Sequence, residues 1–124
     1  MDLLRLLLLK LETISEHDGV DTWEYTRDDI GLEGFEWDQV VYHYGLACEA
    51  GLVAPGGNGQ IGRILVRRLT WAGHDFVDAV RDDEIWRRTR QGATAAGGFS
   101  VDLLKDLAKG FIRKKISEHT GIEI

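Results

Sequence analysis

The sequence predicts a single α+β domain in which helices stand on both sides of a tight β-hairpin. Three observations lead to this fold class. The chain has only 124 residues, and chains divide into several domains at greater lengths. Leucines recur at three- and four-residue spacing near the N-terminus, as in a helix with one apolar side. Two apolar runs flank the turn at residues 55–59, Pro-Gly-Gly-Asn-Gly, which is typical of a β-hairpin.

The first helix is expected over residues 2–15. Asp2 lies where a capping residue is favoured, and its charge suits the positive end of the helix dipole. The apolar side is made of five leucines: Leu3, Leu4, Leu7, Leu8 and Leu11. Leu6 and Leu9 widen that side. We therefore expect this helix to be covered by the body of the domain and by another helix.

A short extended segment is expected over residues 25–32, because Trp23 and Tyr25 favour a strand and Gly31 interrupts helices. A second long helix follows over residues 36–50, and Gly51 ends it. Its buried side is expected to carry Val40, Tyr44 and Ala47. The residues expected outside that side are Asp38, Gln39, Tyr42 and, at its border, His43.

The hairpin is expected to pair residues 52–54 with residues 60–69. Thr70 then caps a helix whose apolar positions are Phe76, Val77 and Val80, and a break is expected near residues 82–84. This order of elements is that of a winged helix with a shrunken or missing middle helix. The expected organisation is a winged helix-turn-helix-like domain over residues 1–92, a small-residue linker over 93–99, and an amphipathic C-terminal helix over 100–119.

Three stretches resemble the bacterial and phage family called domain of unknown function 2513. They are YHYGLACEAGL from Tyr42, LTWAGHDFVDAVRDDEIW from Leu69, and GGFSVDLLKDLAKGFIRKK from Gly97, and the second is the most specific. The resemblance covers roughly residues 2–116 in the same order. It implies a winged-helix-like fold and a phage or prophage setting, and it carries over no catalytic residue. The chain has Gly45 and Ala47 where larger apolar residues are common.

Charge is distributed unevenly along the chain. The whole sequence has 21 acids and 15 bases, for a net charge of −6, which argues against a protein that coats nucleic acid nonspecifically. Residues 1–59 carry 12 acids and 3 bases, whereas residues 60–124 carry 9 acids and 12 bases. An acidic half joined to a mildly basic half predicts a dipolar surface.

Sequence-specific DNA binding is one hypothesis for a winged helix, with a helix in the major groove and the hairpin on phosphates. The candidate contacts to DNA or to another partner are polar residues of the second long helix and arginines of the returning strand: Gln39, Tyr42, His43, Arg63, Arg67 and Arg68. The objection is an acidic face at the start of that helix, formed by Glu33, Glu36 and Asp38, because affinity for DNA rests mainly on neutralised phosphates.

A noncatalytic protein-interaction module is the preferred reading, with an unidentified protein partner. The last helix has a basic polar side, formed by Lys105, Lys109, Arg113, Lys114 and Lys115. Its apolar side is expected to pack on residues 3–11 or on a partner, and exchange of this helix between two copies would give a homodimer. A further alternative is an inhibitor whose acidic face competes for a nucleic-acid-binding host protein.

An enzyme is not expected, and neither is a metal or another cofactor. The four histidines show no metal-ligand spacing with Cys48, no serine lies in a nucleophile elbow, and the 55–59 turn lacks the lysine of a phosphate loop. The apolar run at residues 3–11 is too short to span a membrane. Together with the single cysteine, these features favour a cytoplasmic protein with no membrane partner.

Overall fold

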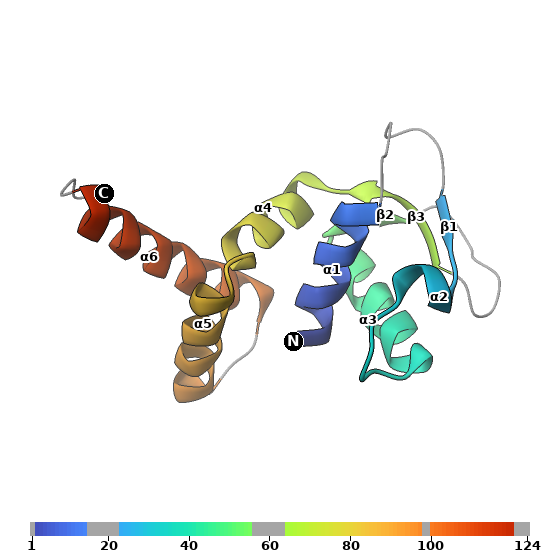
Figure 1. Ribbon diagram of the computed structural model, residues 1–124, viewed down its shortest axis with the longest axis horizontal. Coiled ribbons are helices and arrows are strands. Elements are labelled where there is room, and N and C mark those ends of the chain that lie inside the picture. Colours follow the sequence, from blue (N-terminus) through green and yellow to red (C-terminus); the bar gives the residue numbers. More distant parts are fainter. Residues whose placement is uncertain (1, 15–22, 56–63, 98–99, 121–124) are drawn as a thin grey trace. The chain divides into compact units, whose positions relative to one another are not determined.

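The computed structural model describes residues 2–14, 23–55, 64–97 and 100–120. The chain divides into two compact units, residues 1–75 and residues 76–124, and each is described by itself. Within the described ranges there are six helices and one three-stranded antiparallel sheet (Figure 1). The predicted α+β class is therefore confirmed. In chain order the elements are α1 (Asp2–Ile14), β1 (Trp23–Tyr25), α2 (Arg27–Ile30), α3 (Trp37–Glu49), β2 (Val53–Pro55), β3 (Ile64–Leu69), α4 (Trp71–Val80), α5 (Asp83–Ala96) and α6 (Val101–Thr120).

The sheet belongs to the first unit and has β3 at its centre, in the order β1-β3-β2. Val53 pairs with Leu69 across β2 and β3, and Tyr25 pairs with Ile64 across β1 and β3. Both pairings are antiparallel, which confirms that two strands flank the glycine-rich turn. Residues 56–63, with most of that turn and the first part of the predicted returning strand, lie outside the described residues.

Helix α1 provides the largest part of the core of the first unit. All five leucines of the predicted stripe are at most 4% exposed: Leu3, Leu4, Leu7, Leu8 and Leu11. The helix packs against α3, α2 and β3, so several elements cover it, as expected. Leu6, which was expected to widen the apolar side, is 36% exposed. The sequence also predicts that the last helix packs on these leucines. That helix belongs to the second unit, so its packing on α1 stays a prediction.

The extended segment predicted for residues 25–32 is wrong beyond Tyr25, because residues 27–30 form the single helical turn α2. Asp29 causes the difference. Its carboxylate accepts hydrogen bonds from the backbone N–H of Thr26 at 2.8 Å and from the Thr26 hydroxyl at 3.0 Å. These bonds lower the pKa of the Asp29 carboxyl. Gly31 then ends the turn at φ 58°, a conformation that favours glycine.

A junction of backbone and threonine contacts joins the end of α3 to the hairpin and to α4. The Thr70 hydroxyl donates to the Gly51 carbonyl at 2.5 Å and accepts from the Gly73 N–H at 3.0 Å. The Thr70 N–H donates to the Leu52 carbonyl at 3.0 Å. A Cβ on Gly73 would lie 2.0 Å from that same carbonyl oxygen, so only glycine fits there. Thr70 is thus the predicted cap of α4, and Gly73 lets the helix approach Leu52.

In the second unit, α5 and α6 pack against each other. The predicted break before α5 is confirmed, since α4 ends at Val80 and the Asp82 carboxylate caps α5 by accepting from the Ile85 N–H at 2.9 Å. The linker predicted for residues 93–99 begins too early. Residues 93–96 continue α5, because alanine is a strong helix former, and Gly97 ends the helix at φ 80°. The Ser100 hydroxyl caps α6 by accepting from the Leu103 N–H at 3.1 Å.

Substitution of single leucines on α1 tests whether its stripe is core. Leu7→Asp is expected to lower the free energy of unfolding by about 3 kcal/mol or more, because it places an unpaired carboxylate at a fully buried position. Leu6→Asp, one residue away and partly exposed, should cost much less. Chemical denaturation measures both values. Equal and small losses for the two variants would show that the stripe is open to solvent.

Alanine substitutions at two helical glycines test the junction. Gly73→Ala is expected to destabilise the protein by about 2 kcal/mol, because the new Cβ would collide with the Leu52 carbonyl. Gly45→Ala in α3 is the matched control, since a Cβ there meets no described atom within 4 Å. It should stabilise the protein by up to about 1 kcal/mol through helix propensity. Thermal melts that rank the two variants in the opposite order would contradict this structure of the junction.

Candidate functional site

The exposed side of α3 carries large apolar side chains that the core does not use. Val40 and Ala47 are buried on the opposite side of the helix, and Tyr44 is half-buried with them, as predicted. Tyr42 is 66% exposed and Leu46, one turn later, is 39% exposed. We call the line formed by these two residues together with Asp38, Gly45 and Glu49 the α3 stripe, because all five are exposed and follow successive turns of one helix side.

Two of the polar candidates on α3, Gln39 and His43, make hydrogen bonds within the helix and its first turn. The side-chain oxygen of Gln39 accepts from the Glu36 N–H at 3.2 Å, so it caps the first turn. His43 Nδ1 lies 2.8 Å from the Gln39 carbonyl oxygen, which can only accept a hydrogen bond, so Nδ1 is the donor in this contact. The Tyr42 and His43 rings meet edge to face, with centroids 5.8 Å apart. Gln39 thus has less capacity to read a base than its residue type suggests.

The arginine candidates lie on β3. Arg67 and Arg68 are exposed, and Arg68 is paired in the sheet with Ala54, while Arg63 lies outside the described residues. Helix α3 is tied to this strand through the Tyr44 hydroxyl, which donates to the Leu65 carbonyl. Within the described part of the chain, no hydrogen bond or ion pair joins either arginine to Gln39, Tyr42 or His43. The structure therefore places the candidates in two groups, one on the helix and one on the strand.

The predicted acidic residues surround the start of α3. Glu33, Glu36 and Asp38 are all exposed. Arg27, Asp28, Glu33 and other residues of the turn from α2 to Phe35 line a shallow hollow of about 280 Å³. The whole first unit carries thirteen acids and six bases. An anionic ligand such as a phosphate backbone would meet repulsion at this end of α3.

Two titratable side chains of α3, Tyr44 and Cys48, are partly buried. Burial raises the pKa of the Cys48 thiol, which keeps the thiol protonated at neutral pH and makes it a weak nucleophile. Burial also raises the pKa of Tyr44. Within residues 2–14, 23–55, 64–97 and 100–120, no group of three or more His, Cys, Asp or Glu could hold a metal ion. In those ranges no helix is both long and apolar enough to cross a membrane.

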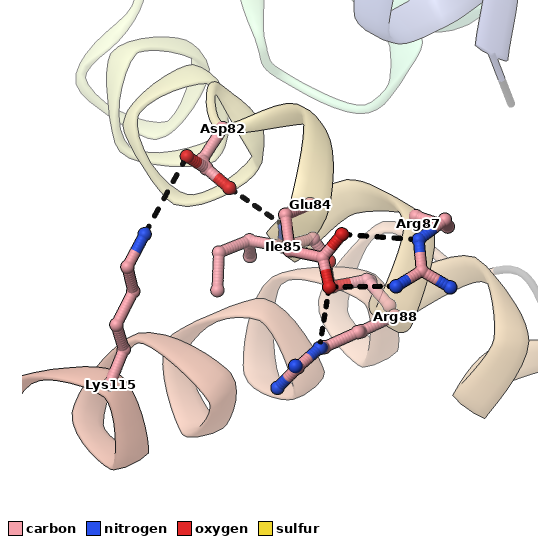
Figure 2. A network of polar contacts seen from close by, with 7 residues as sticks. Asp82, Glu84, Ile85, Arg87, Arg88 and Lys115 are labelled. Carbon is pink, nitrogen blue, oxygen red and sulfur yellow. Dashed lines mark hydrogen bonds and ion pairs between the residues drawn. The ribbon is translucent and has the colours of Figure 1, made fainter. Parts of the chain in front are cut away.

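A polar network in the second unit pairs Asp82 and Glu84 with basic side chains of α5 and α6 (Figure 2). The Glu84 carboxylate accepts from Arg87 at 2.7 Å and from Arg88 at 3.1 Å, and the Arg87 bond lowers the pKa of Glu84. Lys115 of α6 lies 3.8 Å from the Asp82 carboxylate at the start of α5. A small polar hollow beside this network is lined by Lys114 and His119 among others. Because its arginine and one of its lysines are already paired, the hollow is a poor anion site.

Sequence reasoning missed three features of the exposed surface. Trp71, the first residue of α4, is 88% exposed, whereas Trp86 of α5 is 4% exposed. Leu46 and Gly45 were not singled out as surface residues. Leu46 could have been found, because it lies four residues after Tyr42 on the side opposite the buried residues. No pattern in the sequence marked Trp71 as exposed.

Comparison with known proteins places the chain in a family. A family model described as "Hypothetical protein (DUF2513)" matches residues 1–100. A protein of Haemophilus influenzae described as "Uncharacterized protein" is 31% identical over 119 residues, which cover 94% of this chain and 96% of that protein. No solved structure matches the chain. The family that the Leu69 motif indicated is thus established: the chain belongs to the domain of unknown function 2513 (DUF2513) family.

Proposed function

We propose that this protein is a noncatalytic protein-interaction module of winged-helix type, which acts in a phage or prophage setting and docks its partner through the α3 stripe. The observation that carries the proposal is the exposure of Tyr42 and Leu46 on a helix whose opposite side is core. Exposed aromatic and apolar side chains on one helix side are typical of protein contacts. The elements α2, α3, the hairpin and α4 follow one another as in a winged helix, with α2 as the shrunken middle helix.

Charge supports a protein target over duplex DNA. A winged helix would present α3 to the major groove, yet Glu36 and Asp38 lie at its start and α3 itself contains no lysine or arginine. Affinity for duplex DNA rests on neutralised phosphates, so an acidic helix start opposes approach before any base is read. The polar group of Gln39 is also engaged in capping.

Two other functions are kept as candidates, each on a specific observation. Sequence-specific DNA binding by a transcriptional regulator is favoured by Arg67 and Arg68, which are exposed on β3 and make no ion pair within the described residues. An acidic inhibitor of a nucleic-acid-binding host protein is favoured by Glu33, Glu36 and Asp38, which could compete for a basic groove.

A duplex DNA titration at two salt concentrations separates these functions. The wild-type protein is expected to form no salt-sensitive complex at micromolar concentration, because the helix start repels phosphates. Fluorescence anisotropy with a mixed-sequence duplex library measures this. Tight, sequence-selective binding that weakens steeply with salt and is lost in Arg67→Ala and Arg68→Ala would contradict the proposal and establish the DNA-binding candidate.

Comparison of α3 variants in a host lysate tests the protein-docking part. Tyr42→Ala and Leu46→Ala are expected to lose specifically retained proteins, since they remove the exposed apolar contacts. Gln91→Ala is the matched control, because it truncates an exposed residue of α5 and leaves α3 intact. Quantitative mass spectrometry of the retained proteins provides the readout. Identical retention by all three variants and the wild-type protein would exclude α3 as the docking surface.

A further inference from the structure

A β-bulge in β3 turns two arginines to the same face of the sheet. Val66 and Leu69 are both buried, although they are three residues apart and side chains of a regular strand alternate between the two faces. The pairing with β2 explains this: Ala54 pairs with Arg68, the next residue of β2 pairs with Val66, and Arg67 has no partner there. The additional residue leaves both Arg67 and Arg68 on the exposed face.

The chain does not neutralise these two guanidinium groups. Arg67 and Arg68 make no ion pair within the described residues, whereas Arg87 and Arg88 of α5 both pair with Glu84. Neighbouring Cα atoms are about 3.8 Å apart, so two side chains on one face can hold the same anionic group or two adjacent ones. Guanidinium groups bind carboxylates with two parallel hydrogen bonds. The exposed face of β3 thus offers a double contact to carboxylates.

An exposed aromatic side chain lies close to the two arginines along the chain. Trp71 is 88% exposed and follows Arg68 by three residues, which places their Cα atoms within about 11 Å of each other. Tryptophan and arginine are enriched among the residues that contribute most to binding at protein interfaces. Two open guanidinium groups near an open indole suit a partner segment that carries both carboxylates and an apolar side chain.

The surrounding charge favours a short acidic protein segment over nucleic acid. Glu24 lies opposite Leu65 on the same exposed face of the sheet, and it is exposed too. The first unit as a whole carries thirteen acids and six bases. A nucleic acid carries phosphates at regular intervals, so a strand longer than the arginine pair would meet these acids and be repelled. A segment with one or two carboxylates contacts the arginines alone.

We propose that Arg67, Arg68 and Trp71 form a docking site for an acidic segment of a partner protein. The carboxylates of the segment bind the two guanidinium groups, and an apolar side chain packs on the indole. This site goes beyond the proposed function, because it shares no residue with the α3 stripe. It gives the protein a second contact surface, basic where the α3 stripe is acidic at its ends.

Selection from a displayed library of random short peptides, on the full chain, tests the proposal. The wild-type protein is expected to enrich peptides in which Asp or Glu residues adjoin an apolar residue, because these match the guanidinium groups and the indole. One enriched peptide, labelled with a fluorophore, is then the probe in fluorescence anisotropy. The double variant Arg67→Ala, Arg68→Ala should weaken its binding at least about tenfold, since charge-assisted hydrogen bonds are lost.

Further variants separate this site from general charge and from folding. Arg113→Ala is the matched control: it removes an exposed arginine of α6 that makes no ion pair within the described residues, and it should leave the affinity unchanged. Trp71→Ala should weaken binding of the same peptide. The double variant Arg67→Glu, Arg68→Glu should enrich basic peptides instead of acidic ones. Since all these side chains are exposed, melting temperatures should stay close to that of the wild-type protein.

A selection without enrichment of acidic residues overturns the inference, as does a peptide that binds the double alanine variant as tightly as the wild-type protein. Salt-sensitive binding of DNA that this variant loses would assign the arginines to nucleic acid instead. Self-association that the same variant abolishes would assign them to a second copy of the chain. Either reassignment overturns the proposal.

Failure of this site and failure of the α3 stripe are distinguishable. Tyr42→Ala and Leu46→Ala should leave the affinity for the acidic peptide unchanged, because neither residue belongs to the site. If the peptide selection fails, the lysate comparison of the α3 variants still tests the stripe. If the α3 variants retain the same proteins as the wild-type protein, the peptide titration still tests Arg67 and Arg68.

Discussion

The close approach of α4 to Leu52 is the constraint on which the first unit depends. Thr70 donates two hydrogen bonds to the segment that follows α3, one to Gly51 and one to Leu52, and Gly73 leaves room for the Leu52 carbonyl. The Leu52 N–H in turn donates to Ala47 at 2.9 Å. This junction holds the end of α3, both strands of the hairpin and the start of α4 together. The C-terminal end of α3, whose opposite side carries Tyr42 and Leu46, is thereby held to the hairpin.

The features predictable from sequence are those set by local patterns. The leucine stripe of α1, the division of α3 into buried and exposed sides, the hairpin strands and the Thr70 cap all follow from spacing and residue type. The helical turn α2 escaped prediction because one aspartate decides it: the bonds between Asp29 and Thr26 outweigh the strand preference of the preceding aromatic residues. Residues 93–96 were predicted as part of a linker because they are small and lie between Gly92 and Gly97, whereas in the structure they extend α5.

The candidate site was predictable only in part, because exposure is a property of packing. Tyr42 could be placed on the outer side of α3 from helical periodicity alone. The structure adds that Gln39 is occupied by its own helix and that Trp71 is open to solvent, and both depend on contacts that no local pattern encodes. Gly45 illustrates the same point: the sequence identifies a glycine, and only the structure shows that a Cβ there would meet no described atom within 4 Å. The resulting surface is apolar at its centre and acidic at its ends.

The central claim is that this surface of α3 contacts protein, whereas the β3 arginines do not contact nucleic acid. Hydrogen–deuterium exchange of the full chain, alone, with the host proteins that it retains from a lysate, and with duplex DNA, tests it most directly. We expect exchange to slow over residues 38–49 when the retained proteins are bound, and exchange over β3 to stay unchanged when DNA is added. Slower exchange around Arg67 and Arg68 with DNA, and no slowing over residues 38–49 with the retained proteins, would contradict it.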